Sequence, residues 1–77
     1  MAGLSFLEPD SKVFLAHMAS GTSGAKIPRW RTRIRGAWLI KVGHHLIGSI
    51  RDVCHVLATL QDTGVTHIPL LFSHPEI

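Results

Sequence analysis

Short apolar runs separated by turn-forming residues fill the first quarter of the chain. Gly3 to Leu7 and Val13 to Met18 are two apolar runs of strand length, and the Pro, Asp and Ser of residues 8–11 between them are typical of a tight turn. This arrangement predicts an antiparallel hairpin. Residues 23–26 then allow one short helical turn before Pro28 halts it.

The middle of the chain predicts a central strand followed by one long helix. Residues 37–42 are apolar on both faces, as in a strand that is buried on both sides, and residues 46–47 form a brief second strand. From Ile50 to Leu60 the apolar side chains recur at spacings of three and four, which is the helical period. Ser49 supplies an N-terminal cap, and Gly64 ends the helix.

The last apolar run completes a small α+β domain. Residues 66–72 are rich in strand-forming side chains, although Pro69 in their middle favours a sheet edge or a bulge. The tail at 73–77 is expected to fray. We therefore expect one domain over residues 1–77, with its core in residues 3–72.

Composition narrows the class of protein. The chain is 45% hydrophobic and 17% charged, which is typical of a globular domain rather than a disordered one. Its lone Cys54 cannot form an internal disulfide, so an intracellular, most simply cytoplasmic, location is expected. No apolar run approaches the ~20 residues of a membrane-spanning helix, so no membrane partner is expected.

A basic cluster interrupts this ordinary composition. Five of the eight basic residues lie within ten positions, at Lys26, Arg29, Arg31, Arg33 and Arg35. The alternation from Trp30 to Arg35 predicts a loop or extended segment with the arginines on one side. Such a cluster beside a Trp can bind a phosphate backbone and stack on a base, so nucleic-acid binding is an alternative function. The competing interpretation is a solvated loop.

Catalytic and metal-binding patterns are weak. Six histidines are present, but His44 and His45 are adjacent and the others are scattered, which matches no metal-ligand spacing. No nucleophile elbow or glycine-rich phosphate loop accompanies the Ser, His and Asp residues. We therefore expect no enzyme, no metal and no cofactor.

Several segments resemble the PDZ family in the same order along the chain. Gly3-Leu4-Ser5-Phe6 is similar to the family's Gly-Leu-Gly-Phe loop, and residues 20–25 resemble the turn after its third strand. Residues 34–42 resemble its Leu-Arg-Val-Gly-Asp-x-Ile-Leu-x-Val stretch, and residues 49–53 resemble the start of its groove helix. The stretch Trp38-Leu39-Ile40 and residues 72–77 are also similar to PDZ-like segments of retroelement polyproteins.

Four features depart from the family pattern. Ala37 stands where the family has Asp, Gly43-His44 replaces Asn-Gly, the insert from Arg29 to Arg35 is unusually basic, and the family's first strand has no counterpart. The resemblance implies a small PDZ-like, partly open β-barrel or sandwich of five to six strands, with one long and one short helix. Without the first strand, the final strand becomes a sheet edge.

The resemblance also implies a function, the binding of a peptide by strand addition between the Gly3–Leu7 strand and the Ile50–Leu60 helix. The peptide's terminal carboxylate would be held by the N–H groups of Leu4, Ser5 and Phe6. The remaining groove residues would be Gly3, Leu7, Ile50, Cys54 and Leu57. In the family, the residue that opens the groove helix selects the peptide side chain two residues before the end. Ile50 stands at this position, so the resemblance implies an apolar side chain there. The expected partner is a C-terminal or extended peptide of another protein, and pairing through an exposed sheet edge is also possible for this chain. A further alternative is that the domain is a structural module that binds no ligand.

Overall fold

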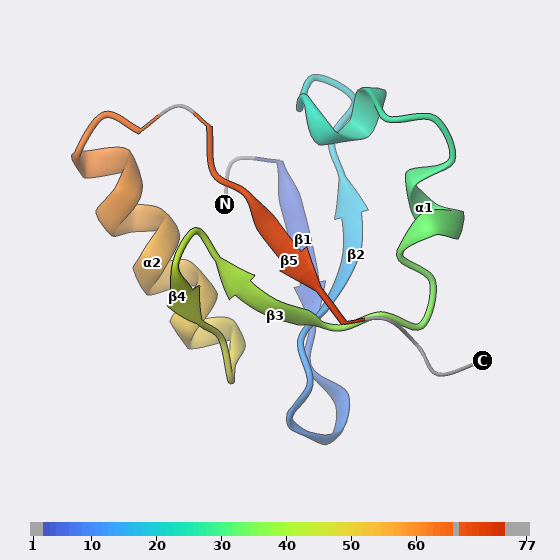
Figure 1. Cartoon of the computed structure of the whole chain (residues 1–77), viewed down its shortest axis with the longest axis horizontal. Helices are drawn as coiled ribbons and strands as arrows, with labels where there is room; N and C mark the ends of the chain where they lie inside the picture. The colour runs from blue at the N-terminus through green and yellow to red at the C-terminus, as the bar shows by residue number, and fades with distance from the viewer. Residues whose placement is uncertain (1–2, 66, 74–77) are drawn as a thin grey trace.

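The computed structural model describes residues 3–65 and 67–73, which form five strands and one main helix (Figure 1). The elements in chain order are β1 (Leu4–Leu7), the 3-10 turn η1 (Pro9–Ser11), β2 (Phe14–Met18), the 3-10 turn η2 (Gly24–Lys26), α1 (Trp30–Arg33), β3 (Leu39–Val42), β4 (His45–Leu46), α2 (Ile50–Asp62) and β5 (Leu70–Phe72). The strands form two antiparallel sheets, ordered β1-β2 and β4-β3-β5. The α+β class is confirmed, and the sheets do not close into a barrel.

The predicted hairpin is the first sheet. Its turn is tight because Asp10 and Ser11 both adopt positive φ, at 51° and 62°, a conformation that short polar side chains tolerate better than most others. The strand register changes between Ser5 and Phe6. Ser5 pairs with His17 and Phe6 with Leu15, so the extra residue of this bulge lies in β2.

The core forms where the two sheets meet α2. Leu39 and Val42 of β3 are both buried, although residues three apart in a regular strand face opposite sides. An irregularity in the β3–β5 register between Leu39 and Lys41 accounts for this, since it turns both side chains inward. They pack in one cluster with Val13 from the hairpin and with Val53, Val56 and Leu57 from α2.

Helix α2 follows the sequence prediction closely. The Ser49 side chain accepts a hydrogen bond from the Asp52 backbone N–H at 3.2 Å, which is the predicted N-terminal cap. The helix runs for 13 residues to Asp62, and Gly64 with φ of 78° turns the chain away. Within the described ranges, no helix is long and apolar enough to cross a membrane.

The segment from Trp30 to Arg35 differs from the extended structure predicted for it. Residues 30–33 form a helical turn, in which the Ile34 N–H donates to the Trp30 carbonyl at 3.1 Å. Successive side chains in a helix are about 100° apart, so Arg31 and Arg33 leave on different sides. The prediction that the arginines share one side was wrong, because alternation of residue types does not reveal backbone hydrogen bonding.

The last strand is shorter than predicted and begins after the proline. Pro69 immediately precedes β5, and its carbonyl accepts from the Gly43 N–H at 2.8 Å. Strand β5 is at the edge of its sheet, as expected. Ser73 does not fray: it is buried, and its hydroxyl oxygen accepts from the Trp38 N–H at 3.0 Å. Residues 66 and 74–77 of the predicted strand and tail lie outside the described residues.

Leu39 and Leu71 provide a matched test of this core. Leu39 is 1% exposed, whereas Leu71 on the neighbouring strand is 50% exposed. We expect Leu39→Ala to lower the free energy of unfolding by about 2–5 kcal/mol through lost burial and a residual cavity. Leu71→Ala should cost about 1 kcal/mol or less. Urea denaturation measures both, and similar losses would contradict the placement of Leu39 at the centre of the core.

Candidate functional site

Strand β1 and helix α2 border the same cavity and run in opposite directions. The Glu8 carboxylate at the end of β1 accepts from the Ile50 N–H, which begins α2, at 2.6 Å. At the other end, Leu4 of β1 and Leu57 of α2 line the same cavity. In Figure 1, β2 lies on one side of β1 and α2 on the other. The structure thus brings together the strand and the helix that sequence reasoning assigned to a groove.

The edge of β1 away from β2 is open. Among the described strands, only β2 pairs with β1. The Ala19 N–H donates to the Gly3 carbonyl at 2.6 Å, and Leu4 pairs with Met18 in register. In an antiparallel ladder this pattern directs the peptide groups of Leu4 away from β2, those of Ser5 toward β2, and those of Phe6 away again. Three backbone N–H groups were predicted to hold the carboxylate. Those of Leu4 and Phe6 therefore point to the open edge, and that of Ser5 does not.

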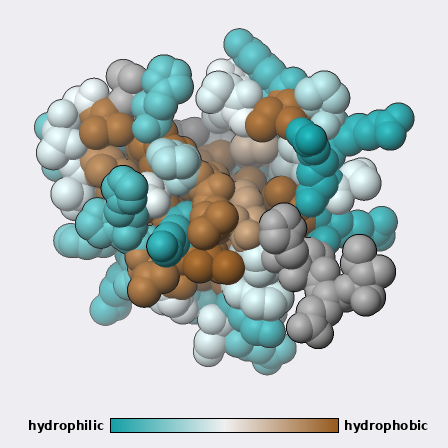
Figure 2. All heavy atoms as spheres, in the orientation of Figure 1, coloured by the Kyte–Doolittle hydropathy of each residue, from teal (hydrophilic) through white to brown (hydrophobic). Residues whose placement is uncertain are grey.

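A cavity of about 560 Å³, here called the central cavity, lies between the hairpin, β5 and α2. Its walls are largely apolar, with side chains from both sheets and α2: Leu4, Leu15, Met18, Leu57, Leu70 and Phe72. Among the described residues of the lining, Arg33 is the one that carries a charge. The volume of the central cavity falls within the ~300–1,000 Å³ typical of ligand sites. On the face in Figure 2, apolar surface gathers over the middle of the molecule, whereas hydrophilic side chains project around α1.

The other predicted groove residues occupy different environments. Ile50 is half-buried against the core, and Cys54, one turn later on α2, is exposed. Leu7 is 60% exposed at the end of β1. Gly3 opens β1 with φ of 77°, and a Cβ built there would lie 2.9 Å from the Ala19 Cβ. Gly3 and Leu7 thus mark the two ends of the open edge.

Sequence reasoning missed Gln61 as a member of this site. Gln61 is a polar residue near the end of α2, yet it lines the central cavity together with Leu57. Ile50, Cys54, Leu57 and Gln61 are spaced by four, three and four residues, so they form one stripe along α2. Gln61 follows Leu57 by four residues, and this spacing was the signal in the sequence that both lie on one face of the helix. The polar side chain of Gln61 favoured a solvent-facing position instead.

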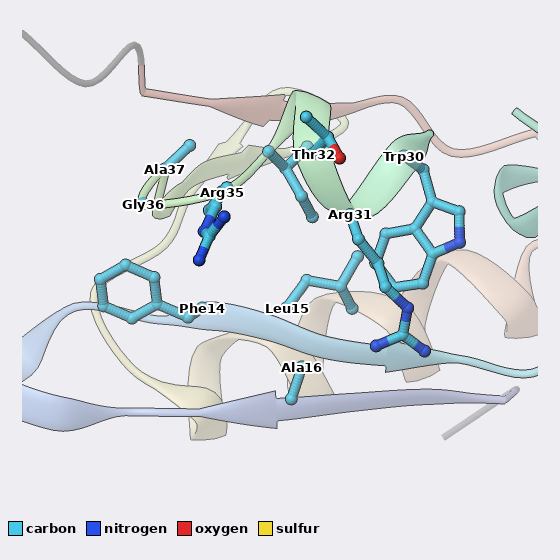
Figure 3. Close-up of a pocket in the computed structure, with 10 residues that line it drawn as sticks. Phe14, Leu15, Ala16, Trp30, Arg31, Thr32, Arg35, Gly36 and Ala37 are labelled. Atoms are coloured by element: carbon cyan, nitrogen blue, oxygen red, sulfur yellow. The ribbon is translucent and has the colours of Figure 1, made fainter. Parts of the chain in front are cut away.

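A second hollow, here called the lateral cleft, lies between β2 and α1 and has a volume of about 320 Å³ (Figure 3). Phe14, Leu15 and Ala16 form its β2 side. Trp30, Arg31 and Arg35 line the opposite side, and the two arginines reach toward β2. Among residues 3–65 and 67–73, no carboxylate belongs to this lining.

The five basic residues of the predicted phosphate site are therefore divided. Arg31 and Arg35 line the lateral cleft, whereas Arg33 lines the central cavity. Lys26 and Arg29 are exposed and line neither hollow. All five are solvent-exposed, but they do not form one continuous basic face.

Two contacts define the chemistry beside the lateral cleft. The Arg31 guanidinium lies 4.8 Å from the centre of the Trp30 ring, within the range of a cation–π interaction. It also lies 3.4 Å from the His17 Nδ1 atom on β2. Residues 3–65 and 67–73 contain no group of three side chains able to hold a metal ion.

Comparisons with family models, curated proteins and solved structures find no match to this chain. The chemistry of the two hollows therefore carries the functional argument.

Gly3 and Gly21 test whether the start of β1 depends on a glycine. Gly3→Ala places a Cβ against Ala19 and forces a side chain into positive φ, so the free energy of unfolding should fall by about 1–2 kcal/mol. Gly21 has nothing within 4 Å of its built Cβ, and Gly21→Ala should change stability by about 0.5 kcal/mol or less. Thermal or urea unfolding compares the two, and equal effects would argue against a strained start to β1.

Proposed function

We propose that this protein binds the carboxyl end of an extended peptide by strand addition to the open edge of β1, beside α2. The observation that carries the proposal is the outward direction of the Leu4 peptide group next to an apolar cavity shared with α2. An open edge offers N–H and C=O groups that a peptide strand can pair with. The resemblance of Gly3-Leu4-Ser5-Phe6 to the PDZ loop supports the same interpretation.

The two ends of the bound peptide have different roles in this proposal. Its terminal carboxylate lies near the start of β1, where Leu4 and Phe6 supply outward N–H groups. Its last side chain enters the central cavity between Leu4 and Leu57, so an apolar residue fits best. Arg33 adds a positive charge to the cavity wall, which favours an anionic end over a cationic one.

Ile50 and Cys54 determine the preference farther along the peptide. Both lie on the stripe of α2 that continues from Leu57 and Gln61. Ile50 is apolar and half-buried, and Cys54 is exposed one turn later on the helix. We therefore propose an apolar side chain two residues before the peptide end. Binding of nucleic acid through all five basic residues has less support, because Arg31 and Arg35 line one hollow, Arg33 lines the other, and Lys26 and Arg29 line neither.

An NMR titration tests the direction of the β1 amides. A peptide ending in apolar-x-apolar should shift the amide resonances of Leu4 and Phe6 more than that of Ser5, whose N–H is already directed toward His17. The same peptide with a C-terminal amide should bind about tenfold or more weakly, because a charge-assisted hydrogen bond is lost. Equal binding of acid and amide, or shifts confined to Ser5, would reject the proposal.

Gln61 and Thr59 test whether the peptide enters the central cavity. Both are exposed on the last turns of α2, but Gln61 lines the cavity and Thr59 is about 160° away around the helix. We expect Gln61→Trp to obstruct the cavity and weaken peptide binding by about tenfold or more, and Thr59→Trp to change it by about twofold or less. Calorimetry measures both affinities. Equal effects would place the peptide elsewhere.

A further inference from the structure

The second edge of the hairpin is also open and faces the lateral cleft. The Val13 carbonyl at the start of β2 accepts from the Leu39 N–H at 2.7 Å. This contact points away from β1, which occupies the other side of β2. Peptide groups two residues apart in a strand point to the same side, so Leu15 directs its N–H and C=O toward the cleft. No described strand pairs with β2 on this side.

The charge around this edge is one-sided. Arg31 and Arg35 reach into the cleft (Figure 3), and none of the described acidic side chains lines it. Among the described residues, Glu8 and Asp52 accept hydrogen bonds from the backbone around the start of α2, away from this cleft. The guanidinium groups in the cleft therefore lack a carboxylate partner among residues 3–65 and 67–73. A planar guanidinium presents a fork of donors that matches a carboxylate in two-point hydrogen bonding.

Arg31 and Arg35 line the same side of the cleft, opposite β2. Arg31 belongs to α1, and the Arg35 N–H donates to the Thr32 carbonyl at 3.4 Å in the turn directly after that helix. Side chains on one face of a strand, at alternate residues, are about 6.6 Å apart. An added strand therefore presents two alternate side chains to the arginine side of the cleft.

We propose that the lateral cleft binds an extended acidic segment of another protein. The segment adds to the open edge of β2, exchanging backbone hydrogen bonds with Leu15, while its two alternate carboxylates pair with Arg31 and Arg35. This site uses the opposite edge of the hairpin from β1, so it does not depend on the proposed binding of a peptide carboxyl end. Its ligand is recognised by internal acidic residues rather than by a terminal group.

The experiment uses the full chain and the capped peptide acetyl-Val-Glu-Val-Glu-Val-amide, which lacks a free carboxyl end. We expect this peptide to shift the Leu15 amide resonance, and its Gln-for-Glu counterpart to bind about tenfold more weakly. Arg31→Gln and Arg35→Gln should each weaken binding by about tenfold. Arg29→Gln makes the same charge change in the same segment but outside the cleft lining, so its effect should be about twofold or less.

Three outcomes would overturn the proposal. Equal losses in the Arg29, Arg31 and Arg35 variants would indicate diffuse charge attraction rather than a cleft. Binding without a change at Leu15 would exclude strand addition to β2. A single-stranded oligothymidylate that displaces the peptide, binds more tightly and weakens steeply with salt would identify nucleic acid as the occupant. Amide spectra of each variant establish that it remains folded.

Discussion

The junction between Val13 and Leu39 joins the two sheets. The Leu39 N–H donates to the Val13 carbonyl at 2.7 Å, and both side chains are 1% exposed in the cluster that packs against α2. A two-stranded hairpin by itself is marginal in water. The β1-β2 hairpin therefore depends on this junction for its stability and its position. Because both hollows have a wall on the hairpin, their shapes depend on the same contact.

Among the described strands, none pairs with the outer edge of β1 or with the outer edge of β2. Open edges in natural proteins are commonly covered, shortened or charged, because they recruit other strands. Here each edge is bordered by a segment of different character: α2 presents a largely apolar stripe beside β1, whereas Arg31 of α1 and Arg35 just after it lie beside β2. One small sheet thus supports two proposals with distinct chemistry, an apolar carboxyl end on one side and an internal acidic segment on the other.

The accuracy of the sequence predictions varied with the range of the interactions involved. The cap of α2 at Ser49, its apolar face and the hairpin turn were predicted correctly, because each depends on residues close together in the chain. The helical turn at Trp30–Arg33 was missed, since alternating residue types suggested an extended segment. Gln61 was also missed, because a polar side chain at the rim of a cavity has no distinct local pattern.

The sequence by itself determined the α+β class, the main helix and the pairing of β1 with β2. Helical periodicity, capping and turn chemistry act within a few residues, so they can be read from the chain directly. Only the tertiary structure decided which strand edges stay open, how the arginines divide between two hollows, and which side of α2 faces β1. These features depend on contacts between distant residues, such as Glu8 with Ile50 and Val13 with Leu39. No local pattern specifies such pairings, because they result from the packing of the whole core.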